Sequence, residues 1–462
     1  MSEDYVTHPI DPESAGALAS RGLRFELLGV DEAGYVPWTE AVNRGFHEAR
    51  PTAEFMATRR TQAPFRRISG VWDDTIPDAA SPVATASSWP TELTVPGLKS
   101  VTAWAISTIT VSATHRRRGV ARELLGAELR TAHALGVPVA ILTASEATIY
   151  GRWGFAPAAM TATWTVDTRD SKWSGPEASG RVHYVTSEQL LVDGHEIVER
   201  MRLSVPGLIA FDGQLWERLL GIGDDTVART MRFLRYDDAE GTPLGFAIYR
   251  VRNEDTHRGR AVAEVQYLAA TTEDASAALW RFLLELDLIG ELRASLRPVT
   301  EPFVWQISDF RAAVKSEEHD HLWARILDVP AALQARRYSA PGRVVLDVSD
   351  PQGFAAGKWL LEVAADGTGS VTRLDGAGAM GAEIAGAGAG AGATGTAVAG
   401  SLNHAADVVS LGVGQLSSIY LGGVSATVLA RAGRITELND GAAERLEAMF
   451  RSPVTPWLSI WF

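Results

Sequence analysis

Hydrophobic and polar positions along the chain change period from strand to helix and predict a series of mixed units. Residues 101–112 form a β-branched run, residues 118–135 place apolar side chains at helical spacing, and residues 137–143 form a continuous apolar run. This order predicts a strand, an amphipathic helix and a buried strand, which together make a βαβ unit. Residues 25–60 predict an earlier strand followed by helical segments, and residues 160–168 predict a strand that closes the first unit.

A second unit repeats the order of strand and helix without the loop chemistry of the first. Strands are predicted at residues 243–251 and 261–269, and a helix over residues 275–290. The link Thr271–Asp274 between the last strand and this helix carries neither glycine nor a basic residue, so we expect a similar fold without the same ligand. Residues 322–337 predict a helix that bridges to a third unit.

The third unit mixes short strands and helices around a tract of very low complexity. Strands are predicted at residues 343–348 and 357–363, and helical segments near residues 405–413 and 441–450. Residues 376–400 are almost entirely glycine and alanine, with a single charge. Because such a composition cannot bury a specific core, it predicts a mobile loop.

Two polar stretches mark loops between these elements. Residues 77–90 are rich in proline and serine and predict a loop or the edge of a sheet. Residues 170–180 form a polar connector of glycine, proline and serine, which suits a domain boundary. The chain therefore reads as an α/β protein of several domains.

Composition agrees with several domains and excludes some functions. The chain has 462 residues, and a domain typically has roughly 100–200 residues, so several domains are expected. Its net charge of −13 repels phosphate backbones, which argues against nucleic-acid binding and permits a cationic substrate. The absence of cysteine excludes disulfides, thiolate metal sites and a cysteinyl acyl-enzyme. The amino end lacks a signal-peptide pattern and no apolar run approaches the ~20 residues of a membrane helix, so the cytoplasm is predicted.

The strongest chemical motif lies where the strand at residues 101–112 meets the following helix. Three basic side chains, Arg117, Arg118 and Arg122, surround Gly119 at the start of that helix. The first turn of a helix presents unpaired N–H groups to an anion, and a glycine lets a pyrophosphate approach the backbone. The alternative interpretation is a solvated helix start with no ligand.

This motif and a second one resemble those of a known family. Arg116-x-x-Gly119-x-Ala121 is similar to the acyl-CoA pyrophosphate loop of the GNAT superfamily of N-acetyltransferases. Together with residues 144–155 (ASEATIYGRWGF), it resembles the enhanced intracellular survival (Eis-like) acetyltransferases. Segments at residues 322–333 and 411–423 also resemble this family, so the resemblance covers nearly the whole chain. The Gly/Ala tract and the long acidic amino end depart from the family pattern.

The resemblance implies an α/β fold with mixed (α+β) sheets, made of tandem GNAT-type folds and a sterol-carrier-protein-like domain. The active N-acetyltransferase domain is expected at residues 1–169 and a degenerate copy at residues 170–320. The sterol-carrier-protein-like domain is expected at residues 321–462, with the Gly/Ala-rich loop inside it and a C-terminal tail that reaches the active site. The family also implies a homohexamer.

Site residues are carried over from the family position by position. The backbone of Ile109, Thr110 and Val111 would pair with the pantetheine arm of acetyl-CoA. Ser145 and Glu146 would line the cofactor cleft. The pyrophosphate would be held by the residues that begin the helix: Arg117, Arg118, Gly119, Val120, Ala121 and Arg122.

Two residues are expected to move protons. Tyr150 would be the general acid, because a phenol stays protonated at neutral pH and can protonate the departing thiolate. The alternative for Tyr150 is aromatic packing on Trp153 and Phe155. The terminal carboxylate of Phe462 would be the base, and the alternative for the apolar tail is simple core or interface packing. The bulky neighbour Trp461 would narrow the amine site.

The resulting hypothesis is an acetyl-CoA-dependent N-acetyltransferase that works by direct attack in a ternary complex. The acceptor would be a primary amine of a polycation such as an aminoglycoside, a polyamine or a lysine side chain. Glu48 could bind its ammonium group, or could be an ordinary surface glutamate. The histidines show no H-x-x-x-H pair, so no metal is expected. The alternatives are a module that binds acyl-CoA or lipid without acetylating amines, and an acyltransferase acting on lipids or polyketides.

Overall fold

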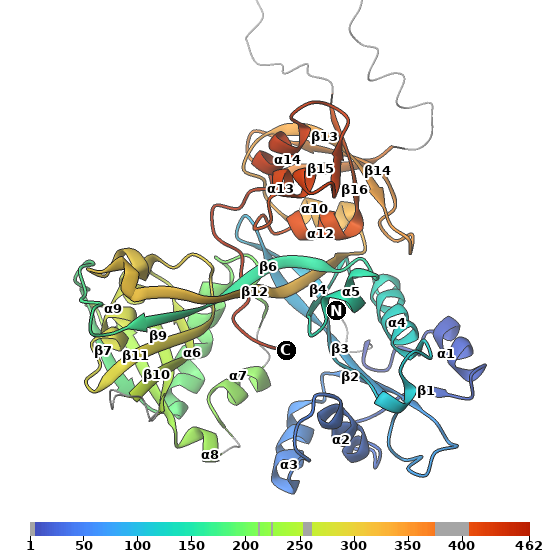
Figure 1. The fold of residues 1–462 in the computed structure, drawn as a ribbon, viewed down its shortest axis with the longest axis horizontal. Helices are drawn as coiled ribbons and strands as arrows, with labels where there is room; N and C mark the ends of the chain where they lie inside the picture. Colours follow the sequence, from blue (N-terminus) through green and yellow to red (C-terminus); the bar gives the residue numbers. More distant parts are fainter. Residues whose placement is uncertain (1–4, 211–212, 223–224, 253–260, 375–405) are drawn as a thin grey trace, which may run out of the picture.

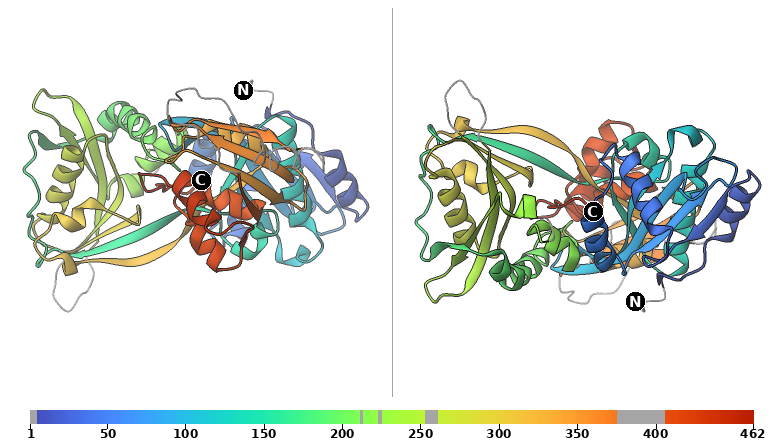
Figure 2. Two further views of the ribbon diagram at one scale, coloured as in Figure 1. Left: turned by 90° about the horizontal axis from the view of Figure 1, so that it is seen from above. Right: turned by 90° about the horizontal axis from the view of Figure 1, so that it is seen from below.

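The computed structural model describes residues 5–210, 213–222, 225–252, 261–374 and 406–462. Two lobes lie side by side and a third sits above them (Figure 1). The two lobes are joined by the long strands β6 (Ala156–Asp167) and β12 (Ala313–Ile326), which run from one lobe into the other. The C-terminus lies between these two lobes in all three views (Figures 1 and 2).

A single mixed sheet runs through both lobes. Among the described residues it has twelve strands in the order β1-β2-β3-β4-β5-β12-β6-β11-β10-β9-β8-β7. Its remaining strands are β1 (Arg24–Leu27), β2 (Arg67–Trp72), β3 (Ala84–Val95), β4 (Lys99–Val111), β5 (Val139–Thr143), β7 (Arg181–Val185), β8 (Met231–Asp237), β9 (Pro243–Arg252), β10 (Ala261–Ala270) and β11 (Ile289–Arg297). The helices of the two lobes are α1 (Pro12–Ala19), α2 (Tyr35–Gly45), α3 (Ala53–Gln62), α4 (Val120–Ala134), α5 (Ala147–Gly151), α6 (Ser187–Arg202), α7 (Gly213–Leu219), α8 (Asp225–Ala228) and α9 (Glu273–Leu284).

The upper lobe has its own sheet, in the order β15-β14-β13-β16-β17. Its strands are β13 (Gly342–Ser349), β14 (Gly357–Val363), β15 (Gly369–Arg373), β16 (Asp407–Gly412) and β17 (Ile435–Glu437). Its helices are α10 (Val329–Ala335), α12 (Val413–Ile419), α13 (Ala426–Arg431) and α14 (Ala442–Phe450). The predicted Gly/Ala loop at residues 376–400 lies outside the described residues.

The predicted βαβ unit of the first lobe is confirmed as β4, α4 and β5. The α4 side chains Leu124, Leu125 and Leu129 are fully buried, because apolar residues at helical spacing gather on the face that packs on the sheet. β4 and β5 are parallel, as the crossover through α4 requires. The first lobe is therefore built around the segment that carries the arginine-rich motif.

The second lobe has the matching unit β10, α9 and β11. The predicted helix over residues 275–290 ends at Leu284, and the chain then enters β11, which pairs in parallel with β10. β11 was not predicted, because charged residues interrupt the apolar pattern of its sequence. In the structure Ile289, Leu292 and Ala294 are the apolar residues that it buries. Thr272 caps α9 by accepting a hydrogen bond from the N–H of Ala275.

The predicted bridging helix over residues 322–337 is wrong in its first part. Leu322–Ile326 belong to β12, which pairs with β5 on one side and β6 on the other. A strand that is buried on both faces carries a continuous apolar run, which periodicity alone does not separate from a helix. Only Val329–Ala335 form a helix. β12 also crosses residues 320–321, where a domain boundary was expected, and the three predicted domain ranges stay predictions.

Two shorter predictions are also corrected. The segment near residues 405–413, expected to be helical, forms β16 from Asp407, and its buried residues Val409 and Leu411 alternate as in a strand. The Pro/Ser stretch at residues 77–90 is a loop only until residue 83, after which it enters β3 in the interior of the sheet. Ser87 and Ser88 are buried there, which the polar composition concealed.

Candidate active site

The first lobe contains an opening between two parallel strands. β4 pairs with β5 only from Ala103 to Ala105, opposite Val139 to Ile141, although β4 continues to Val111. Beyond Ala105 the edge of β4 is therefore free of β5 and can offer its backbone groups to an extended ligand. Ile109, Thr110 and Val111, the residues expected to pair with pantetheine, lie on this stretch.

A β-bulge shapes the same edge. Thr108 and Ile109 of β4 stand opposite the single residue Ala86 of β3, and Thr108 has a φ of 52°. The hydroxyl of Thr85 donates a hydrogen bond to the Thr108 carbonyl at 2.8 Å, which holds the bulge in place. Because a bulge bends its strand and redirects its backbone, it helps to turn β4 away from β5.

The amino end of α4 lies at the end of the same strand. Gly119 is the N-cap, with a left-handed φ of 76° and no side chain to cap the helix. A Cβ on Gly119 would lie 2.8 Å from Nη1 of Arg21. The first-turn N–H groups, including those of Val120, Ala121 and Arg122, have no intrahelical acceptor, so they can bind an anion. The side chains of Arg117 and Arg118 are exposed beside them.

A buried pair that the sequence did not reveal anchors this loop. His115 is 4% exposed, and its Nε2 donates to Oδ2 of Asp73 at 3.0 Å. The hydrogen bond from His115, followed by those from Thr75, holds the pKa of Asp73 well below its usual range. Nη1 of Arg118 lies 3.7 Å from the same carboxylate. The position of His115 inside the arginine-rich motif could have pointed to a role in holding this loop. Asp73 lies 42 residues away, and nothing in the sequence around it indicates the contact.

Tyr150 lies in the short helix α5 after β5 and is 7% exposed. Burial raises the pKa of its phenol, and a hydrogen bond with Ser145 partly opposes that rise. Its ring meets the ring of Phe155 edge-on at 6.3 Å, so the aromatic packing considered as an alternative is present. A buried phenol with a raised pKa is a proton donor at neutral pH, and the two roles are compatible. Ser145 and Glu146 are both exposed beside it.

The end of the chain lies near the β4–β5 opening, on the face of the sheet opposite Tyr150. The ring of Phe462 packs edge-on against Trp89 of β3, with ring centroids 5.7 Å apart. Trp89 pairs with Ala105, which is the last β4 residue paired with β5. Trp89, Ala105 and Ile141 belong to one core cluster, whereas Tyr150 belongs to the cluster under α4. Tyr150 and Phe462 therefore lie on opposite faces of the sheet at the opening.

Glu48 is exposed in the turn after α2. That turn starts close to the β4 edge, because a Cβ on Gly45 would lie 2.5 Å from the Cβ of Thr110. The N–H of Glu48 donates to the carbonyl of Asn43 at 2.8 Å, and its carboxylate has no hydrogen-bond partner among the described residues. The structure thus places Glu48 on the segment next to the predicted cofactor edge, with its carboxylate available.

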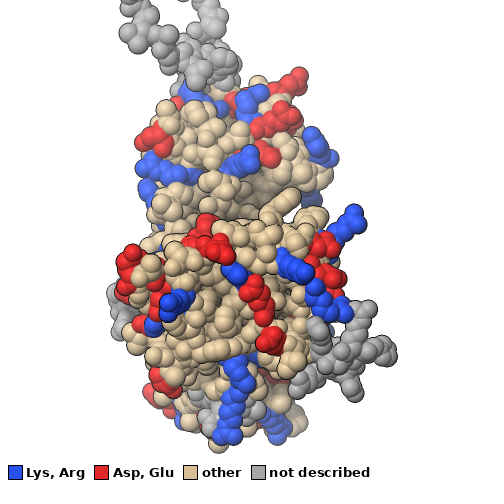
Figure 3. Space-filling view, turned by 90° about the vertical axis from the view of Figure 1, so that its left-hand side faces the viewer, with Lys and Arg blue, Asp and Glu red and all other residues tan. Residues whose placement is uncertain are grey.

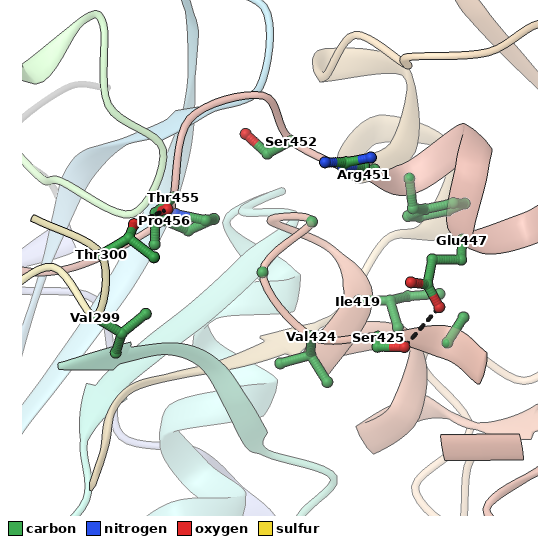
Figure 4. Close-up of a pocket in the computed structure, with 14 residues that line it drawn as sticks. Val299, Thr300, Ile419, Val424, Ser425, Glu447, Arg451, Ser452, Thr455 and Pro456 are labelled. Carbon is green, nitrogen blue, oxygen red and sulfur yellow. Dashed lines mark hydrogen bonds between the residues drawn. The ribbon is translucent and has the colours of Figure 1, made fainter. Parts of the chain in front are cut away.

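A separate pocket of about 310 Å³ lies where the tail leaves the upper lobe (Figure 4). The carboxylate of Glu447 accepts hydrogen bonds there from Ser425 Oγ at 2.6 Å and from the N–H of Thr427 at 2.9 Å. These bonds outweigh burial and lower the pKa of Glu447. On the other side of the pocket the hydroxyls of Thr300 and Thr455 are 2.6 Å apart. Sequence-predicted site residues are absent from its lining.

Charge, metal ligands and helix length add three observations about the rest of the molecule. Lys and Arg are interspersed with Asp and Glu on the side formed by the second and upper lobes, rather than gathered by sign (Figure 3). In the described part of the chain, groups of three or more acidic or histidine side chains placed to hold a metal ion are absent. In the same residues, every helix is too short or too polar to cross a bilayer.

Comparison with protein families matches all three units. Residues 29–158 and residues 207–355 each match an acetyltransferase (GNAT) domain, and residues 329–459 match a sterol carrier protein domain. The second GNAT match includes β10, α9 and β11, which repeat the βαβ unit of the first lobe. GNAT acetyltransferases use acetyl-CoA, and the glycine and arginines at the start of α4 suit its pyrophosphate.

Similar proteins span nearly the whole chain. An uncharacterized N-acetyltransferase of Streptomyces avermitilis is 34% identical over 95% of this chain and 99% of its own. The N-acetyltransferase Eis of Mycobacterium tuberculosis is 32% identical over 78% of this chain and 81% of its own. The crystal structure of Eis1 from Mycobacterium abscessus is 26% identical with a TM-score of 0.75, and covers 95% of this chain and 100% of its own. The chain is therefore an N-acetyltransferase, and it belongs to the Eis-like GNAT family, which joins two GNAT domains to a sterol-carrier-protein-like domain.

Proposed function

We propose that this enzyme transfers the acetyl group of acetyl-CoA to a primary amine of a polycationic acceptor by direct attack in a ternary complex. Aminoglycosides, polyamines and lysine side chains are the acceptor classes. Tyr150 is the general acid and the terminal carboxylate of Phe462 is the base. The observation that carries this proposal is the placement of Tyr150 and Phe462 on opposite faces of the sheet at the β4–β5 opening.

This placement gives each reactant its own side of the sheet. The start of α4 and the β4 edge at Ile109–Val111 hold acetyl-CoA, which supplies the reactive thioester. Arg117, Arg118 and Arg122 add charge-assisted hydrogen bonds to its pyrophosphate, and Ser145 and Glu146 line its cleft. The amine then approaches from the face where Phe462 packs on Trp89. Direct attack needs no covalent enzyme intermediate, which agrees with a chain that lacks cysteine.

Two residues move the protons of the reaction, one as acceptor and one as donor. The nitrogen of a neutral amine forms its bond to the acetyl carbon, and the proton that it loses goes to the carboxylate of Phe462. The Tyr150 hydroxyl gives its proton to sulfur as the carbon–sulfur bond breaks. The carboxylic acid and the tyrosinate then return to their starting states by exchange with solvent. The raised pKa of Tyr150 keeps its proton in place until the thiolate leaves.

The net charge of the whole chain and the position of Glu48 support a cationic acceptor. The chain carries a net charge of −13, and the free carboxylate of Glu48 lies on the turn next to the β4 edge. Such a carboxylate attracts the ammonium groups of a polycation that are not being acetylated. Trp461, which is half exposed next to the terminal residue, narrows the space for the acceptor.

The test is a panel of amines with acetyl-CoA, read by mass spectrometry of the products. We expect polyamines, aminoglycosides and lysine peptides to gain one or more acetyl groups, and neutral amines to be poorer acceptors. Acetyl-CoA binding without acetylation of any amine would instead favour the alternative, a module that binds acyl-CoA or lipid. A homohexamer and a cytoplasmic location complete the proposal, and sedimentation analysis tests the first of them.

A further inference from the structure

The second GNAT domain repeats the opening between two parallel strands that the first domain has. β10 pairs in parallel with β11 only from Ala261 to Val265, and β10 continues to Ala270. An irregularity at Gln266 shifts its register against β9 at the same point, as the bulge does in β4. The β10 edge at Tyr267 and Leu268 therefore corresponds to the β4 edge assigned to pantetheine.

This second edge is occupied by a side chain of the protein itself. Nη1 of Arg297 donates to the carbonyl of Leu268 at 2.8 Å, and its Nε donates to Oε1 of Glu301 at 2.7 Å. Both charged side chains are buried, at 7% and 6% exposed. Because the guanidinium already bonds to the carbonyl of Leu268, this edge cannot pair with an extended cofactor in the same way.

The C-terminal tail packs on Arg297 next to this edge. The ring of Trp457 stacks on the Arg297 guanidinium at 4.9 Å, and the backbone N–H of Trp457 donates to the carbonyl of Pro206 at 3.1 Å. The tail passes so close to Gly207 that a Cβ there would lie 2.8 Å from the Trp457 carbonyl oxygen. Gly207 has a φ of +94°, which also favours glycine.

The last four residues of the tail, Ser459 to Phe462, are each held by at least one further contact. The hydroxyls of Tyr267 and Ser459 are 3.1 Å apart and buried. Nε2 of His321 donates to the Ile460 carbonyl at 2.8 Å, and the same ring meets Trp461 edge-on at 4.4 Å. Nη2 of Arg218 donates to the Trp461 carbonyl at 3.2 Å, and Phe462 then packs on Trp89.

We propose that the second GNAT domain, in which Arg297 bonds to the β10 edge where a cofactor would pair, holds the C-terminal tail in register; we call its contacts with residues 457–461 the tail seat. Tyr267 and His321 are positioning residues in this seat, and they act through Ser459 and Ile460 on the carboxylate of Phe462. The inference rests on the proposed role of that carboxylate as the base. Chain ends otherwise fray, and a slip of one residue would move the carboxylate by about 3.5 Å.

The test compares His321→Leu, which cannot donate to Ile460, with His321→Gln, whose amide can. We expect His321→Leu to lower kcat at least about tenfold while the Kd of acetyl-CoA stays unchanged, and His321→Gln to recover most of the loss. Tyr267→Phe, which removes only the hydroxyl that meets Ser459, should give a smaller loss of the same kind. Tyr249→Phe is the matched control, because its buried hydroxyl contacts Tyr184 and not the tail.

A second readout follows the tail itself. Carboxypeptidase digestion of each folded variant, followed by mass spectrometry, measures how fast Phe462 is released. Faster release from both His321→Leu and Tyr267→Phe than from Tyr249→Phe is expected. If folded His321→Leu and Tyr267→Phe release Phe462 at the wild-type rate and keep the wild-type kcat, the proposed tail seat is refuted. Faster release with an unchanged kcat would leave the seat in place and refute the carboxylate as base, so the two hypotheses fail separately.

Discussion

Phe462 meets Trp89 edge-on, with ring centroids 5.7 Å apart and an interplanar angle of 83°. Trp89 is itself held by Arg66, whose guanidinium lies 4.1 Å above the ring, and by Phe65 at 5.7 Å. The last residue of the chain thus rests on a fixed platform whose cross-strand partner is Ala105, at the start of the β4–β5 opening. This contact fixes the place of Phe462, on whose carboxylate the proposed mechanism depends.

Gly119 is expected to be essential for acetyl-CoA binding. Gly119→Glu places a side chain at a φ of +76°, with its Cβ 2.8 Å from Nη1 of Arg21, and adds a negative charge where a pyrophosphate would bind. Calorimetry should detect no acetyl-CoA binding by the folded variant. Gly136→Glu is the matched control, because Gly136 has a φ of +71° but nothing within 4 Å of its Cβ position. An unchanged Kd in Gly119→Glu would refute the pyrophosphate site.

Tyr150→Phe is expected to reduce turnover without disturbing the fold. Phenylalanine keeps the edge-on contact with Phe155 and removes only the hydroxyl, together with its proton and its hydrogen bond with Ser145. We expect kcat to fall by about 10²–10⁴, the usual effect of losing a general acid. Because burial raises the pKa of Tyr150 above 10.0, the wild-type enzyme should stay active up to about pH 10 and lose activity above it. Full kcat in Tyr150→Phe would leave the residue with a packing role only.

Sequence reasoning succeeded where a pattern was local and failed where contacts were distant. The spacing in α4 and the glycine and arginines at its start were enough to place Gly119 at a helix terminus beside a strand. The residues that hold that loop and the tail were not predictable from the sequence. Asp73 lies far along the chain from His115, and His321 and Arg297 lie far from the tail residues that they contact. Leu322–Ile326, the end of β12, were predicted as a helix for a related reason, because a stretch of strand that is buried on both faces lacks the alternation that identifies a strand.

Glu48→Gln is expected to weaken the binding of a cationic acceptor. The carboxylate is exposed, so its attraction for an ammonium group is modest, and KM should rise about two- to fivefold at low salt. The difference from the wild type should shrink as ionic strength increases, because salt screens exposed charges. Glu177→Gln, an equal change of charge in the exposed connector to the second domain, should leave KM unchanged. Equal KM values for Glu48→Gln and the wild type would assign Glu48 to the ordinary surface.

His321 should make the folded protein less stable as the pH falls. Burial, partly opposed by the hydrogen bond to Ile460, lowers its pKa from 6.5 to about 4. The unfolded chain therefore takes up a proton below pH 6.5 that the folded chain refuses, and the stabilisation present above pH 6.5 is lost between pH 6.5 and about 4. At pH 5 the loss amounts to about 2 kcal/mol.

Urea unfolding of the wild type and of His321→Gln at pH 7.5 and at pH 5 measures this contribution. All other titrating groups are shared by the two proteins, so the difference between their pH dependences isolates His321. The wild type should lose about 2 kcal/mol more than the variant between the two pH values. Equal pH dependence would mean that His321 titrates normally in the folded protein.

The end of the chain provides the most direct test of the base. A few residues added after Phe462 replace its carboxylate by an amide, whereas deletion of Phe462 moves the carboxylate back by about 3.5 Å. Both changes should reduce kcat far more than acetyl-CoA affinity, because the pyrophosphate site at Gly119 lies on the α4 side of the sheet, away from the tail. The same residues added at the amino end are the control and should leave kcat unchanged. If the carboxy-terminal extension retains full kcat on the best amine, the terminal carboxylate is not the base, and Glu48 or Glu146 acting through water becomes the next candidate.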